Sequence, residues 1–279
     1  VPHCVNCDVS LTYHKAHNQL VCHYCGYTYR LPQVCPECKG TEFKMQGFGT
    51  EKVEEEIAGQ FPTAKVERLD FDTARTRTAY ADFEKGKTQI LIGTQMLSKG
   101  LDFGNVSVVG ILSADSLMNF PDFRAHERAY QLMVQVSGRA GRRDKRGTVV
   151  LQTTQPEHPL IRMVQHFAYK EMVSLQLSER SMFRYPPYYR LIVLILRSRN
   201  AEALQEMSAL YAEKLRARLG ERVLGPVTPP ITRVQTLHIK EIVLQIEISA
   251  GIAPLREILE GIHAEMQGYA LFKQLLVHY

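Results

Sequence analysis

All six cysteines of the chain lie within its first 38 residues, and each belongs to a C-x-x-C pair. The pairs are Cys4/Cys7, Cys22/Cys25 and Cys35/Cys38. Two such pairs supply the four thiolates of a tetrahedral zinc site, and a bound metal can replace an apolar core in a short segment. A disulfide framework would instead spread cysteines through the fold. The sequence therefore predicts a zinc module over residues 1–46 in a reducing compartment, the cytoplasm.

The cysteine spacing leaves the pairing open, because six thiols exceed the needs of one site. The C-x2-C-x14-C-x2-C spacing of the first two pairs lies just short of the usual zinc-ribbon range, and it leans toward a site made from them. The second and third pairs, nine residues apart, can also share an ion. Nearby histidines are more plausible as solvated surface residues than as ligands while thiolates are available: His3, His14, His17 and His23.

Length and composition exclude several classes of protein. A chain of 279 residues has room for about two domains with their own cores. Its longest apolar run, Leu191–Leu196, is far too short to cross a membrane. The net charge of +5 permits a polyanionic partner without requiring one, and positive residues are concentrated between Arg139 and Arg146.

Residues 47–180 alternate between helical and strand-like segments, which predicts a parallel sheet covered by helices. We expect a first helix after Gly47 with Thr50 as its N-cap, and a helical stretch over 159–179 at the end. Between them the pattern predicts strands at 65–69, 90–93, 106–112 and 148–153, and helices at 75–85 and 123–136.

The stretch RYPPYYR interrupts this pattern near residue 185 and indicates a domain boundary. Beyond it we expect strands at 191–197, near 223–227, at 241–248 and at 272–278, with helices at 201–219 and 254–266. This β-α-β-β-α-β order predicts a ferredoxin-like α+β domain over residues 181–279.

Two segments of the middle domain have the composition of phosphate-binding loops. ILIGTQMLSKGLDF, residues 90–103, passes from a strand into a turn, where Thr94 and Gln95 follow the carboxyl end of the strand. QVSGRAGRRDKRG, residues 135–147, places Arg139 and Arg142 after glycines, which suits bidentate phosphate binding. The Gly-Lys-Thr at 86–88 is predicted to be a simple turn, because a helix precedes it and a strand follows.

These segments resemble motifs V and VI of the superfamily 2 helicases. With three C-x-x-C pairs ahead of them and PDFRAHERAYQL between, the whole chain resembles the C-terminal part of the replication-restart helicases of the PriA family. The resemblance implies that residues 47–180 are the second RecA-like lobe of an ATP-dependent 3′→5′ DNA helicase that unwinds stalled forks and initiates primosome assembly.

The resemblance also implies roles for individual residues. Arg139 and Arg142 would be the catalytic arginine fingers that stabilise charge on the γ-phosphate of ATP. Further residues would bind ATP, namely Gln135, Gly138, Gly100 and Asp102. A third set would contact the DNA backbone, namely Thr94, Gln95 and Lys99.

The family has four C-x-x-C pairs, of which the inner two share one zinc and the outer two another. Mapped onto this chain, Cys4, Cys7, Cys22 and Cys25 form a complete site. Cys35 and Cys38 would belong to a second site, whose partners we expect upstream of Val1.

The resemblance implies Zn²⁺ as a cofactor, with ATP and Mg²⁺ in the intact protein. The implied partners are DNA forks and single strands, primosome loader proteins and single-stranded DNA-binding protein. We expect a bacterial cytoplasmic monomer without membrane association. The chain has no G-x-x-x-x-G-K-[ST] segment, so we expect no ATP hydrolysis by it alone. The main alternative is a non-enzymatic zinc-ribbon module that binds nucleic acid or protein. A weaker third alternative is an α/β enzyme that acts on a small molecule, because no base–nucleophile pair stands out in the sequence.

Overall fold

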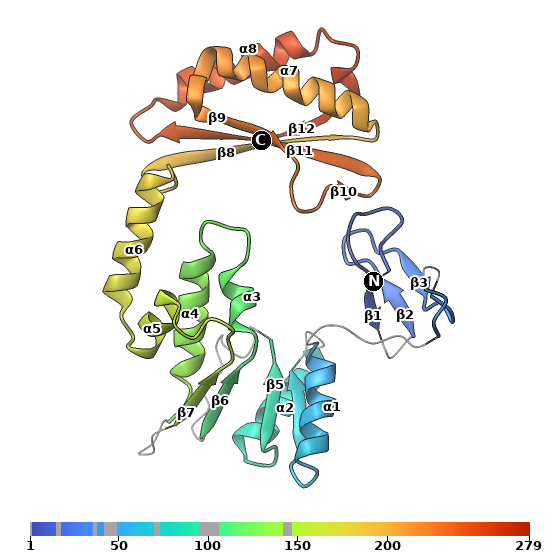
Figure 1. The fold of residues 1–279 in the computed structure, drawn as a ribbon, viewed down its shortest axis with the longest axis vertical. Helices are drawn as coiled ribbons and strands as arrows, with labels where there is room; N and C mark the ends of the chain where they lie inside the picture. The colour runs from blue at the N-terminus through green and yellow to red at the C-terminus, as the bar shows by residue number, and fades with distance from the viewer. Residues whose placement is uncertain are drawn as a thin grey trace. The chain divides into compact units, whose positions relative to one another are not determined.

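The structure is a computed structural model that describes residues 2–14, 18–35, 38–41, 49–69, 73–94, 106–141 and 147–279. The chain forms two compact units. One combines residues 1–43 with residues 180–279, and the other comprises residues 44–179 (Figure 1). Within the described ranges, no helix has the length and apolar character that a membrane crossing requires.

The N-terminal module is a small antiparallel sheet with a cysteine-lined interior. Its strands are β1 (Thr12–His14), β2 (Gln19–Val21) and β3 (Thr28–Arg30), and β2 lies between the other two. The buried residues are mostly cysteines, joined by Leu11 and Leu20. Because so few apolar side chains are buried, a bound metal is the natural source of stability for this module.

The C-terminal domain has the predicted β-α-β-β-α-β order. It consists of β8 (Tyr189–Ser198), α7 (Ala201–Leu219), β9 (Val223–Val227), β11 (Leu237–Glu247), α8 (Ile252–Met266) and β12 (Leu276–His278). The strands pair antiparallel in the order β9-β11-β8-β12, which is the ferredoxin-like arrangement. Both helices cover one face of the sheet (Figure 1).

Alternation along the two central strands explains how this sheet covers its core. Leu194 and Leu196 of β8 and Ile242 and Leu244 of β11 all point to the helix-covered face and are completely buried. Their intervening neighbours face the other way, as period-two patterning requires. The longest helix, α7, begins where the side chain of Asn200 accepts hydrogen bonds from two backbone amides.

The middle unit contains two parallel β-α-β units. In the first, β4 (Val66–Leu69) and β5 (Ile90–Gly93) flank α2 (Thr73–Glu84), and α1 (Thr50–Gln60) precedes them. In the second, β6 (Val108–Ile111) and β7 (Thr148–Leu151) flank α3 (Ala114–Met118) and α4 (Ala125–Ser137). Both pairs are parallel, so the predicted α/β class is confirmed.

Several predicted boundaries are wrong. Thr50 is the first residue of α1 and Gly49 occupies the N-cap position. The stretch predicted over 159–179 is two helices, α5 (Pro159–Gln165) and α6 (Tyr169–Met182), because Phe167 has a left-handed φ of 51° that ends the first. Before β12, residues Phe272–Gln274 form a 3₁₀ turn where the prediction placed strand.

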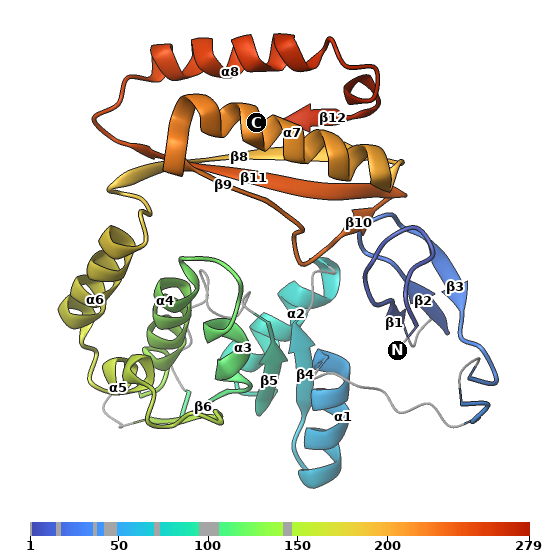
Figure 2. The ribbon, with the colours of Figure 1, turned by 45° about the horizontal axis from the view of Figure 1, so that its top comes forward.

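The ferredoxin-like domain also has a short strand that the sequence did not indicate. This strand, β10 (Arg233–Val234), forms a hairpin with the start of β11. Figure 2 shows the hairpin extending from the sheet toward the zinc module, which belongs to the same compact unit.

Candidate functional site

Four cysteine sulfurs converge in the N-terminal module. The Sγ atoms of Cys4, Cys7, Cys22 and Cys25 all lie within 4.8 Å of one another, and those of Cys4 and Cys25 are 3.6 Å apart. A tetrahedral zinc with Zn–S bonds of about 2.3 Å has sulfur–sulfur edges of about 3.8 Å. The donor set and its dimensions therefore fit zinc. The structure brings together the first two C-x-x-C pairs, the arrangement toward which the spacing leaned.

Backbone turns hold the thiols in place. The N–H of Cys22 donates to the carbonyl of Tyr27, and the N–H of Gly26 returns to the carbonyl of Cys22, both at 2.9 Å. Gly26 has a φ of 74°, the left-handed conformation that glycine adopts without steric cost. In the first two C-x-x-C segments, both sulfurs of each pair lie in the same cluster.

The charges of the sulfurs also favour a cation. Burial raises the pKa of Cys7 to about 12, and burial likewise raises the pKa of Cys4. Burial acts against the Cys22 thiolate as well, but hydrogen bonds from the backbone of Cys25 and Tyr24 outweigh it and lower its pKa to about 7. Burial therefore disfavours a thiolate at Cys4 and at Cys7 when no cation is present. A divalent cation is needed to balance four thiolates.

The third pair forms the same kind of turn outside this cluster. The N–H of Cys35 donates to the carbonyl of Gly40 at 2.8 Å, and the N–H of Lys39 donates to the carbonyl of Cys35 at 3.0 Å. Cys38 is exposed and Cys35 is half-buried. Two thiols are half the number of ligands that a tetrahedral zinc site needs.

None of the nearby histidines that the structure describes belongs to the four-cysteine cluster. The rings of His14 and His23 contact each other with centroids 5.3 Å apart, and His3 is exposed. His17 lies outside the described residues.

The zinc module is bound to the C-terminal domain by contacts that sequence reasoning missed. The backbone N–H of Gln235 donates to the Sγ of Cys7 at 3.2 Å, and the hydroxyl of Thr232 donates to the carboxylate of Asp8 at 2.6 Å. These partners are more than 220 positions apart in the chain. No local pattern in the sequence marks such a contact.

The glycine-arginine segment begins at the end of α4. Gly138 caps this helix, and the half-buried Arg139 follows it. The N–H of Gly141 donates to the carbonyl of Val106 at 3.1 Å, just before β6 begins. Gly147 closes the loop against its own start, since a Cβ there would lie 2.5 Å from the carbonyl carbon of Ala140. These contacts place Ala140 and Gly141 beside the amino ends of β6 and β7.

Two further residues of the predicted site lie in the described part of this unit. Thr94 is exposed just after the carboxyl end of β5, and Gln135 is exposed on α4. Five of the predicted residues lie outside the described part of the chain: Gln95, Lys99, Gly100, Asp102 and Arg142.

The Gly-Lys-Thr segment is a turn, as predicted. Gly86 has a φ of 73° between α2 and β5. The hydroxyl of buried Thr88 donates to the carboxylate of Glu67 at 2.7 Å, and Lys87 pairs with Asp82 at 3.5 Å. Both polar residues are therefore engaged within the fold.

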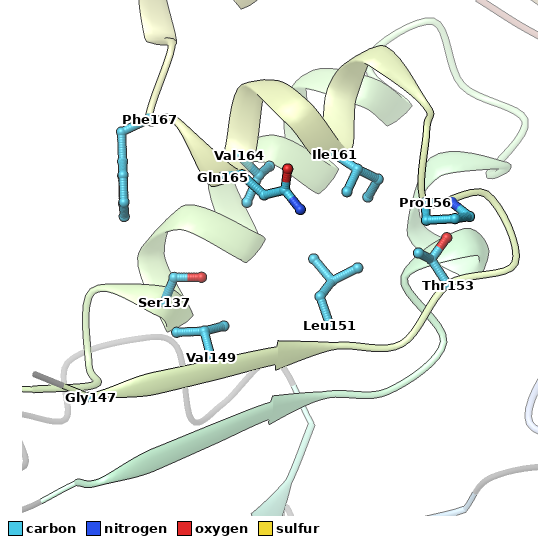
Figure 3. Close-up of a pocket in the computed structure, with 10 residues that line it drawn as sticks. All are labelled: Ser137, Gly147, Val149, Leu151, Thr153, Pro156, Ile161, Val164, Gln165 and Phe167. Atoms are coloured by element: carbon cyan, nitrogen blue, oxygen red, sulfur yellow. The ribbon is translucent and has the colours of Figure 1, made fainter.

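A hollow of about 420 Å³ lies between β7, α5 and the end of α4 (Figure 3). Its lining is mainly apolar, including Val149, Leu151, Ile161 and Val164. The hydroxyl of Ser137 already donates to the carbonyl of Met133 at 2.6 Å. Among the lining residues that the structure describes none is charged, so these residues alone do not provide the chemistry of a triphosphate site.

Comparison with protein families matches three segments in chain order. Residues 4–30 match the Cys-rich region domain of the PriA DNA helicases, residues 37–144 the helicase conserved C-terminal domain, and residues 181–271 the primosomal protein N C-terminal domain. The chain belongs to the PriA family. The match to the Cys-rich region, together with the four convergent sulfurs, assigns zinc binding to the N-terminal module.

Curated relatives named replication restart protein PriA match nearly the whole chain. The Bacillus subtilis protein is 38% identical over 274 residues, covering 96% of this chain and 34% of the relative. The Synechocystis protein is 41% identical over 242 residues, covering 83% of this chain and 29% of the relative. The Haemophilus influenzae protein is 35% identical over 251 residues, covering 88% and 34%. The chain thus spans about a third of the length of these relatives.

Proposed function

We propose that the chain is the C-terminal part of an ATP-dependent 3′→5′ DNA helicase that unwinds stalled replication forks and initiates primosome assembly. The observation that carries this proposal is the glycine-arginine loop at the end of α4 in a lobe that matches the helicase C-terminal domain. Its base is closed by Gly147 and tied to Val106, so that Arg139 extends from a defined position. A fixed cationic group can stabilise charge that develops during phosphoryl transfer.

The residues with proposed roles in ATP and DNA binding all belong to this lobe. Arg139 and Arg142 act as arginine fingers on ATP and Mg²⁺ supplied by a partner lobe. Gln135, Gly138, Gly100 and Asp102 form the remaining ATP contacts. Thr94, Gln95 and Lys99 contact the phosphates of the tracked strand, since such contacts hold DNA without reading its sequence.

We further propose three functional regions, with residues 1–46 as the zinc module, 47–180 as the second RecA-like lobe and 181–279 as the ferredoxin-like domain. The first two cysteine pairs bind one zinc. Cys35 and Cys38 supply two ligands of a second zinc, because their turn repeats the geometry of the Cys22 turn. Proposed partners are fork and single-stranded DNA, primosome loader proteins and single-stranded DNA-binding protein, with the protein acting as a monomer in the bacterial cytoplasm.

The test joins the chain to a lobe that carries a P-loop and measures DNA-dependent ATP hydrolysis. Arg139→Ala is expected to lower kcat by about 10³- to 10⁵-fold, the usual effect of losing an arginine finger. The matched control is Arg162→Ala, which removes an exposed arginine from α5 in the same unit and should leave kcat unchanged. An Arg139→Ala protein with full ATPase would refute the catalytic role and favour a non-enzymatic zinc-ribbon module. The chain without the added lobe is expected to show no ATP hydrolysis.

A further inference from the structure

The three C-x-x-C turns differ in the partner of one backbone amide. In the second and third turns, the N–H four residues after the first cysteine donates to the carbonyl of that same cysteine, as Gly26 and Lys39 do. In the first turn this position is Asp8, and its N–H donates to the carbonyl of Arg233 at 2.9 Å. A residue of the C-terminal domain therefore takes the place of the turn's own carbonyl.

Further hydrogen bonds join the same two segments. The N–H of Thr236 donates to the carbonyl of Asn6 at 2.8 Å, and the N–H of Gln235 donates to the sulfur of Cys7 at 3.2 Å. The hydroxyl of Thr232 donates to the Asp8 carboxylate at 2.6 Å. Three consecutive residues of the first cysteine turn thus have partners in residues 232–236, the hairpin segment that leads through β10 into β11 (Figure 2).

The hairpin is shaped for this contact. Gln235 and Thr236 have φ values of 50° and 68°, and consecutive left-handed residues form the tight turn that joins β10 to β11. Residues with a Cβ adopt this conformation at a cost, so compensating contacts are needed to retain it. Both of their amides donate to the zinc module, and Val234 packs against the cysteine cluster.

The chemistry of the sulfur links this contact to the metal. A zinc ligand is a thiolate, and an N–H donor forms a stronger hydrogen bond to an ionised acceptor than to a neutral one. Groups that hydrogen-bond to metal ligands fix their orientation and raise the affinity of the site. The amide of Gln235 is such a group for Cys7.

We propose that the β10–β11 hairpin forms the outer shell of the zinc site, so that zinc binding and docking of the ferredoxin-like domain on the zinc module stabilise each other. The proposal rests on zinc binding by Cys4, Cys7, Cys22 and Cys25. Because thermodynamic coupling is reciprocal, weakening the docking must weaken zinc binding, and removing zinc must loosen the hairpin by the same factor.

The first test weakens the docking and measures the metal. The full chain carrying Thr232→Val and Val234→Ser loses the bond to Asp8 and the apolar contact with the cysteines, but retains all four ligands. Zinc affinity, measured by competition with a chromogenic chelator, is expected to fall about tenfold. The control is Tyr13→Phe, which removes a 2.9 Å hydrogen bond to Asn18 inside the zinc module and should leave the affinity unchanged. Equal affinities in the docking variant and the wild type would overturn the proposal.

The second test removes the metal and measures the hairpin in the wild-type chain. Amide hydrogen exchange is followed with zinc bound and after chelation. The amides of Asp8, Gln235 and Thr236 are expected to exchange about tenfold faster without zinc, whereas amides in the β8–β11 ladder keep their protection. Unchanged hairpin exchange would overturn the coupling although zinc binding stands. A wild-type chain that binds no zinc would instead refute the zinc site itself.

Discussion

Gly147 offers a sharp test of the glycine-arginine loop, because a single methyl group cannot be accommodated there. A Cβ at this position would lie 2.5 Å from the carbonyl carbon of Ala140 and 2.6 Å from its Cβ, whereas ordinary contacts of this kind are 3.4–4 Å. The backbone nitrogen of Gly141 would lie closer still, so relief of the overlap requires Ala140 and Gly141 to move away by at least about 0.9 Å, the difference between 2.5 and 3.4 Å. Arg139 is the residue immediately before Ala140, so this displacement moves the proposed finger.

The expected effect on catalysis follows from that displacement. A misplacement of about 1 Å can cost about 10²-fold in rate, which corresponds to about 2.7 kcal/mol of transition-state stabilisation. Gly147→Ala in the chain joined to a P-loop lobe is therefore expected to lower the kcat of DNA-dependent ATP hydrolysis by about 10²-fold. Zinc content should not change, because the substitution lies in the other compact unit.

Gly110→Ala is the matched control for this experiment. Gly110 lies in β6, paired with Val150 of β7, and a Cβ added there meets no atom within 4 Å. Both variants add one methyl group to the β6–β7 pair, Gly110→Ala within β6 and Gly147→Ala directly before β7. Equal ATPase rates for the two variants would show that the position of the loop does not govern catalysis, and the reasoning would fail.

Three further predictions concern stability. Removing zinc with a chelator should lower the amide protection of β1–β3, whose interior is lined by cysteines, while the apolar core of the C-terminal domain keeps its protection. Loss of protection in both would contradict the separate cores. Leu194→Ala should lower the free energy of unfolding by about 2–5 kcal/mol in urea titrations, because this side chain is fully buried. Leu276 on the neighbouring strand is half exposed, so Leu276→Ala should lower the free energy of unfolding by less than about 0.5 kcal/mol. Burial acts to raise the pKa of Asp122, but hydrogen bonds from Arg124 and the charge of Arg128 outweigh it and lower the pKa. The carboxylate therefore contributes stability above pH about 4 that is lost progressively as the pH falls through its lowered pKa. Asp122→Asn should destabilise the unit most at neutral pH, and the difference from the wild type should shrink as the pH falls below about 4 in the same titrations.

Local signals explain where the sequence predicted elements correctly. The bounds of α7 and β9 match their predicted ranges, 201–219 and 223–227. Asn200 supplies an N-cap and Gly220 a left-handed residue with a φ of 62° at the end, so neighbouring residues are sufficient to define the helix. Such signals depend on a few consecutive residues, so they can be recognised in the sequence without knowledge of the fold.

Predictions failed where distant contacts decide the local structure. Nothing near residue 167 in the sequence marks the left-handed turn that separates α5 from α6, because no glycine or proline interrupts residues 160–182. The strand β10 has only two residues, too few for any periodicity. Its partners are the start of β11 and a cysteine turn more than 220 positions away.

The amino-acid sequence alone determined the chemistry available to this protein. C-x-x-C pairs supply thiolates of the kind that zinc prefers, and the sequence sets Arg139 and Arg142 three residues apart, each directly after a glycine. Ligand type and short spacing are local properties of the chain. These motifs carried the resemblance to the family, and the alternation of helical and strand-like segments predicted the α/β class.

The tertiary structure decided which of these groups work together. Six thiols allowed more than one pairing, and only the folded module places four of them within 4.8 Å of one another. Only the fold brings Gln235 to the sulfur of Cys7 and Gly147 against Ala140. Such encounters depend on the packing of whole sheets and helices, which no short stretch of sequence contains, because their energy is gained between segments that are remote in the chain.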